Sequence, residues 1–104
     1  MAEVRRTAPI CAQHVPDKET FLRDRIAGSF RVGPADSDGE LSFWYCCPCG
    51  CGAVAPLASG KGFKPSDGPS WQWDGSTDAP TLMPSVNHVG HWHGWLKAGV
   101  WESC

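Results

Sequence analysis

Long apolar runs are missing from this 104-residue sequence, and so is an excess of positive charge. No stretch reaches the ~18–20 apolar residues of a membrane span, and no apolar signal-peptide core follows Met1. The formal net charge is −2 at pH 7, whereas proteins held to nucleic acid through its phosphates are strongly basic. We therefore expect no membrane span, a cytoplasmic location (host cytoplasm or virion if a phage encodes the chain) and no nucleic-acid partner.

The linear motifs of several enzyme classes are also absent. The sequence has no H-E-x-x-H, no G-x-S-x-G and no phosphate-binding P-loop. It also lacks the H-x-E that precedes the cysteine pair of zinc deaminases. Asp74 and Asp78 lie in the stretch DGSTDAP, where they are more typical of turns than of an acid–base pair. The sequence therefore favours a non-enzymatic role, and it predicts no catalytic residue.

The cysteines are the strongest chemical signal. Six are present, and four of them lie within the six residues 46–51. Disulfides among such close neighbours would close very small loops and stabilise little. A tight thiol cluster in a chain without a secretory signal indicates a metal site rather than a disulfide framework. A redox dithiol is disfavoured because Pro and Gly prevent this segment from opening a helix, and the nearby imidazoles favour zinc over iron.

The segment CCPCGCG (46–52) can bring several thiols onto one ion. Pro48, Gly50 and Gly52 allow a sharp bend, because proline fixes φ and glycine adopts positive φ. Zinc is bound tetrahedrally by thiolates and imidazoles, and we expect the imidazole from a remote hairpin. The predicted ligands are Cys47, Cys49, Cys51 and one of His91 or His93, with His88 and Cys46 as substitutes.

The chain divides at about residue 40. Residues 1–40 are expected to form an irregular arm with a short helix at about 18–27, capped by Asp17, and a turn-rich linker at 33–40. Residues 41–104 are expected to form a β domain, because short aromatic and β-branched runs alternate there with Gly and Pro. The predicted strands are 41–46, 53–58, 70–73, 81–86 (interrupted at Pro84), 91–96 and 99–101.

Six tryptophans supply much of the apolar area. Trp71 and Trp73 share a face of their predicted strand, and Trp92 and Trp95 lie in the histidine hairpin. Each ring buries roughly 150–250 Å², so we expect them to form a small core beneath the metal. The alternative is an exposed aromatic surface for a protein partner or for stacking on single-stranded bases.

Four segments together resemble a known family. They are CPCGCG (47–52), WQWDG (71–75), PTLMPSV (80–86) and HWHGWLKAGVW (91–101). Over about residues 41–104 the chain resembles the DUF6527 family of small cysteine- and histidine-containing proteins from bacteria and phages. The resemblance implies a zinc-binding β domain without an established reaction.

These observations predict a mostly β fold: a small zinc-stabilised β module with zinc-ribbon-like hairpins, preceded by a short N-terminal helix or arm. The predicted function is a zinc-binding structural or interaction module, a phage or bacterial accessory protein that docks on a larger protein assembly. The second hypothesis is a zinc-dependent enzyme or enzyme subunit, and the third is single-stranded nucleic-acid binding.

Overall fold

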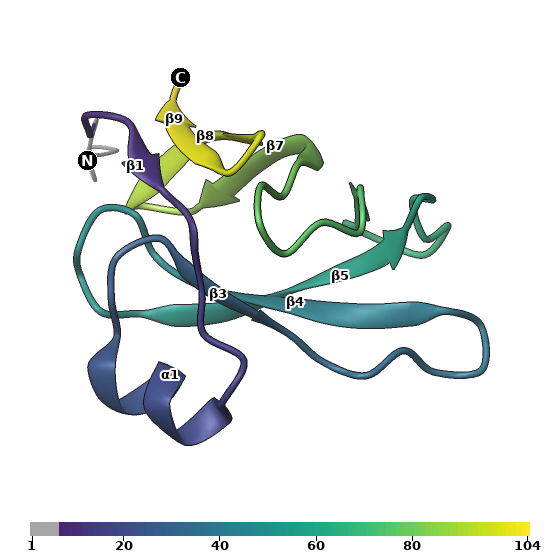
Figure 1. Cartoon of the computed structure of the whole chain (residues 1–104). Helices are drawn as coiled ribbons and strands as arrows, with labels where there is room; N and C mark the ends of the chain where they lie inside the picture. Colours follow the sequence, from purple (N-terminus) through teal and green to yellow (C-terminus); the bar gives the residue numbers. More distant parts are fainter. Residues whose placement is uncertain (1–6) are drawn as a thin grey trace.

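The computed structural model describes residues 7–104, so the first six residues of the predicted arm lie outside the described residues. The described chain is mostly β with one short helix (Figure 1), as predicted. The elements are β1 (Ile10–Cys11), β2 (Gln13–His14), α1 (Lys18–Asp24), β3 (Ser29–Val32), β4 (Glu40–Cys46), β5 (Val54–Lys61), β6 (Trp71–Trp73), β7 (Leu82–His88), β8 (Trp92–Lys97) and β9 (Val100–Ser103). None of the helices in this part of the chain is long and apolar enough to cross a membrane.

All nine strands belong to one sheet, in the order β1-β9-β8-β7-β6-β5-β4-β3-β2. The two edge strands, β1 and β2, are separated by Ala12 alone. One short N-terminal segment therefore pairs with β9 at one end of the sheet and with β3 at the other. The sheet is nearly closed on itself, and Figure 1 shows β7, β8 and β9 lying above the long β4–β5 hairpin.

The main core fills the space inside this curved sheet. Strand β4 turns Phe43 and Tyr45 inward, and β8 contributes Trp92. Trp101 is also fully buried, and its indole N–H donates to the carbonyl of Gly28 at 2.9 Å. The prediction of a tryptophan-rich core is confirmed for residues 73, 92 and 101, whereas the indoles of residues 71 and 95 are half-buried.

A second, smaller core lies under α1 on the opposite face of β4. Phe21 of the helix packs there with Cys46 and Val15, which are also buried. The Asp17 carboxylate caps the helix by accepting a hydrogen bond from the Thr20 backbone N–H at 2.9 Å, as predicted.

The helix is shorter than predicted. It ends at Asp24 and is capped by Arg25, which adopts a left-handed conformation (φ 45°) and donates its backbone N–H to the Phe21 carbonyl. Strands β1, β2 and β3 lie in residues expected to be irregular. Their short segments carry little alternation, and they are strands because the edges of the sheet supply hydrogen-bonding partners.

Strand β7 contains the predicted irregularity at Pro84. Leu82 pairs with Leu96 and Val86 pairs with Gly94, so residues 83–85 of β7 face one residue of β8. Two extra residues therefore bulge out of β7 at this point, and the Met83–Pro84 peptide bond is cis. Bulges redirect side chains locally and are frequent beside active sites.

Candidate active site and thiol cluster

The predicted thiol cluster is present. The sulfur atoms of Cys47, Cys49 and Cys51 lie within 4.8 Å of one another, with Cys47 buried and Cys51 exposed. The Cys47 and Cys49 sulfurs are 3.3 Å apart, well beyond the ~2.05 Å of a disulfide bond. Three thiols converging from one turn can hold a metal ion.

Local backbone geometry brings these thiols together. Gly50 and Gly52 have φ values of +86° and +81°, which L side chains rarely adopt. The Cys47 N–H donates to the Ala53 carbonyl at 2.9 Å and closes the turn at its base. Arg25, at the end of α1, donates from Nη1 to the Gly52 carbonyl at 2.8 Å. The helix thus anchors the turn to the rest of the fold.

Cys46, a predicted substitute ligand, is directed away from the cluster. Neighbouring residues of a strand face opposite sides of a sheet, and Cys46 packs in the small core with Phe21, whereas Cys47 joins the main core. Burial raises the pKa of both thiols. The core around Cys46 consists of apolar side chains. A raised thiol pKa in such surroundings favours an inert structural role for Cys46.

His88 lies next to Tyr45. Tyr45 precedes Cys47, the first cysteine of the cluster, by two residues. The Tyr45 and His88 rings contact edge to face, with centroids 5.8 Å apart. Burial, and secondly the negative charge of Cys47 and Cys51, raises the pKa of Tyr45. The His88 Nδ1 atom is buried and has no hydrogen-bond partner within residues 7–104. A buried imidazole nitrogen without a partner is a ligand type of closed zinc sites, and within residues 7–104 His88 lies outside the group of thiols whose sulfurs are within 4.8 Å of one another.

The two imidazoles predicted as first-choice ligands lie in different surroundings. His91 is in the turn before β8, with its ring centroid 4.8 Å from that of His88. His93 is on β8 and is hydrogen-bonded to Ser85. The two do not share a strand face, because β8 begins only at Trp92. In the described part of the chain, neither belongs to the thiol cluster.

Ser85 and His93 form the second candidate site. The distance from Ser85 Oγ to His93 Nε2 is 3.1 Å, and both residues are half-buried. Ser85 comes from the bulge of β7, and His93 comes from the neighbouring strand β8. When the imidazole carries its proton on Nδ1, its Nε2 atom accepts a hydrogen bond from the Ser85 hydroxyl. A serine hydroxyl next to a base of this kind is an activated nucleophile.

The surroundings of the pair hold its backbone in place. The Trp71 indole N–H donates to the Ser85 carbonyl at 3.1 Å, across the gap where β6 is too short to pair with this part of β7. Asn87 pairs directly opposite His93, so the two side chains share one face of the hairpin. No side chain of residues 7–104 hydrogen-bonds to His93 Nδ1, so the arrangement is a dyad.

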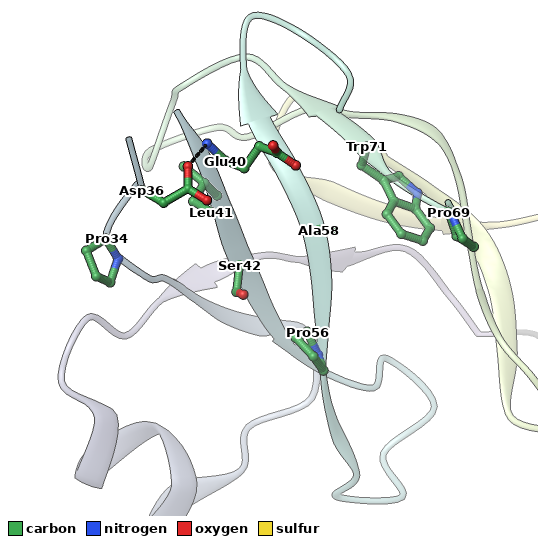
Figure 2. A pocket seen from close by; sticks show the side chains of 9 residues that line it. All are labelled: Pro34, Asp36, Glu40, Leu41, Ser42, Pro56, Ala58, Pro69 and Trp71. Atoms are coloured by element: carbon green, nitrogen blue, oxygen red, sulfur yellow. Dashed lines mark hydrogen bonds between the residues drawn. The ribbon is translucent and has the colours of Figure 1, made fainter. Parts of the chain in front are cut away.

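Two cavities flank this region. One, of about 400 Å³, is lined by Lys64, Gln72, Met83, Pro84 and Trp95, and Pro84 immediately precedes Ser85. The other, of about 680 Å³, lies over the β4–β5 hairpin and ends at Trp71, as Figure 2 shows. Trp71 lines this groove and also donates to the Ser85 carbonyl, so the groove is linked to the segment that carries the serine through this one residue.

Comparison with protein families identifies one match. The family described as "bacterial ubiquitination-like system serine protease (BubE)" matches residues 16–104. The chain belongs to this family. A search of curated proteins and a search of solved structures both found no match. The match is to BubE rather than to DUF6527, and the resemblance to DUF6527 stays a prediction.

Membership of the family corrects the predicted function. The interpretation as a zinc-binding structural module that docks on a larger assembly is wrong, because the family is named for a serine protease. The predicted bacterial setting and protein partner agree at a coarse level with a ubiquitination-like system. A phage origin and the identity of the partner stay predictions.

Sequence reasoning missed Ser85 as a site residue, and it gave His93 a different role. The serine-enzyme motif G-x-S-x-G is a linear pattern, and this chain lacks it. Here the two groups are eight residues apart and meet across a hairpin whose first strand bulges. The usable signal was a serine directly after a strand-interrupting proline, facing a histidine-rich strand.

Proposed function

We propose that the chain is a serine peptidase in which Ser85 is the nucleophile and His93 is the general base and acid. The observation that carries the proposal is the 3.1 Å contact between Ser85 Oγ and His93 Nε2. The name of the family supports it independently. The family's system also supports a protein or peptide as the substrate.

The proposed reaction follows from the dyad. Ser85 Oγ attacks the carbonyl carbon of the scissile peptide bond while His93 Nε2 takes the hydroxyl proton. The tetrahedral intermediate collapses as the C–N bond breaks, and His93 gives the proton to the departing amine. Water, deprotonated by the same imidazole, then hydrolyses the ester on Ser85 and restores the free hydroxyl. Asn87, opposite His93 on the same face, is our candidate to orient the ring through Nδ1.

We also propose that the metal held by the thiols is a structural zinc ion. Cys47, Cys49 and Cys51 would bind it, with His88 as the fourth ligand and His91 as its alternative. Four protein ligands leave no open position for substrate, so the ion would stabilise the fold. The expected location remains the cytoplasm.

A fluorophosphonate probe, which reacts covalently with activated serine hydroxyls, tests the proposal. The wild-type protein should react, and Ser85→Ala should not. Ser66→Ala serves as the matched control, because Ser66 is exposed and lies outside both cavities. Equal labelling of wild type and Ser85→Ala, or no labelling of a folded wild type, would refute the assignment.

A further inference from the structure

The groove that ends at Trp71 has a defined floor and two walls. Its floor is the outer face of β4 and β5, where small side chains, Ser42 and Ala58, pair across the strands. Pro34 lies along one side, and Trp71 with Pro69 lies on the other side of β5, as Figure 2 shows. A floor of small residues between raised walls leaves room for an extended polypeptide to lie along the sheet face.

Negative charge gathers at one end of this groove. Asp36 and Glu40 line it, and the carboxylates of Asp36, Asp38 and Glu40 lie within 4.8 Å of one another. None of them forms an ion pair within residues 7–104, and no lining residue is cationic. The Asp36 Oδ1 atom accepts hydrogen bonds from the backbone N–H groups of Asp38 and Glu40, both at 2.9 Å. The Asp36 carboxylate is therefore held in place by the loop backbone while it lacks a cationic partner.

The groove is connected to the segment of the proposed nucleophile through Trp71. The Trp71 ring lines the groove, and its indole N–H binds the carbonyl of Ser85. A chain lying in the groove would thus pass the ring that contacts the Ser85 backbone.

We propose that the groove binds an extended segment of the polypeptide substrate that carries a basic side chain, with Asp36 and Glu40 as its specificity-determining residues. This proposal rests on the proposed peptidase function and names the class of its substrate. The unpaired carboxylates supply the complementary charge, and continuity through Trp71 with Ser85 connects the groove to the reaction.

The test measures binding without cleavage. Three fluorescein-labelled decapeptides of Gly, Ala and Ser, identical except for a central Lys-Arg, Gln-Gln or Glu-Asp pair, are titrated with the Ser85→Ala protein by fluorescence polarisation. The Lys-Arg peptide should bind about fivefold or more tightly than the Gln-Gln peptide, the gain from about 1 kcal/mol of exposed ion pairing. The Glu-Asp peptide should bind most weakly.

Charge-neutral variants locate the effect. Asp36→Asn with Glu40→Gln should abolish the preference, and Asp36→Asn retains the side-chain oxygen that accepts the two backbone hydrogen bonds. Glu19→Gln, on the exposed face of α1, should keep the preference. Equal binding of the three peptides, or no binding, would overturn the groove assignment. Because fluorophosphonate labelling of the wild type is measured separately, that outcome would leave the Ser85–His93 assignment intact.

Discussion

The thiol turn and the serine bulge are built in opposite ways. The thiol turn is local: Cys47, Cys49 and Cys51 come from five consecutive residues, and two glycines with positive φ bring them together. The serine bulge depends on strand pairing, because Ser85 and His93 meet only when β7 and β8 form a hairpin with two extra residues on one side. A local cluster can be recognised from spacing alone, whereas a cross-strand pair cannot.

The two regions also divide the chemistry. The thiol turn is anchored by Arg25 at the end of α1, and its first cysteine joins the main core, which suits an ion that stabilises the fold. The serine and histidine are half-buried, and Pro84, the residue before the serine, lines a cavity, which suits a site that meets a substrate. Stability and activity should therefore respond separately to changes in the two regions.

Metal removal should have the largest effect. Chelation under reducing conditions at neutral pH should lower the Tm by more than about 15 °C, because loss of the ion removes several kcal/mol of folding free energy. Thermal unfolding followed by circular dichroism measures the change. Cys49→Ser should act in the same way, whereas Cys104→Ser, an exposed cysteine outside the cluster, should not. An unchanged Tm of the metal-free protein would show that the ion does not stabilise the fold.

Ser85→Ala should affect activity alone. We expect peptide cleavage to fall at least about a thousandfold, because the nucleophile is lost. The Tm should stay close to that of the wild type, since a half-buried hydroxyl at a bulge contributes little to the core. Cleavage kinetics and thermal unfolding on the same preparations test both statements. A large fall in Tm would show that the bulge serves the fold.

The two histidines provide the sharpest separation. His93→Ala should lower the rate of fluorophosphonate labelling at least about a hundredfold, the usual contribution of a general base, with the metal content unchanged. His88→Ala should lower the metal content and the Tm instead. Elemental analysis and labelling rates are measured for both variants. Loss of metal from His93→Ala together with slow labelling of His88→Ala would show that His93 is the metal ligand and His88 the base.

A smaller effect is expected at Trp71. Trp71→Phe keeps a ring in the groove but removes the N–H that binds the Ser85 carbonyl. We expect kcat to fall about tenfold, equivalent to about 1.4 kcal/mol of lost positioning, and KM to remain similar. A rise in KM with kcat unchanged would limit Trp71 to a role in the groove wall.

The smallest effect should come from the helix cap. Hydrogen bonds from the Thr20 side chain and backbone lower the pKa of Asp17 below its ordinary 3.8. Its stabilising contribution is therefore complete above that value and is lost as the pH falls through the lower pKa of the folded state. Asp17→Ala should reduce the Tm slightly at neutral pH, and Glu19→Gln should change it less. Equal Tm values for wild type and Asp17→Ala would show that the cap contributes nothing.

The fold and the two regions were predictable to different degrees. Short aromatic and β-branched runs separated by Gly and Pro predicted β4 to β9, and Pro84 predicted the irregularity in β7. Strand β3 was missed because Phe30 and its neighbours are extended through pairing with β4, a tertiary effect. The thiols were found from spacing, but the role of His93 depends on register, which the sequence does not display.

Peptide mapping of the fluorophosphonate adduct tests whether Ser85 is the nucleophile and His93 its base. The metal-loaded wild-type protein is labelled, digested and examined by mass spectrometry. We expect one phosphonylated residue, Ser85, and a strongly reduced yield in His93→Ala. An adduct on another serine, or on Ser85 in equal yield without His93, would contradict this assignment.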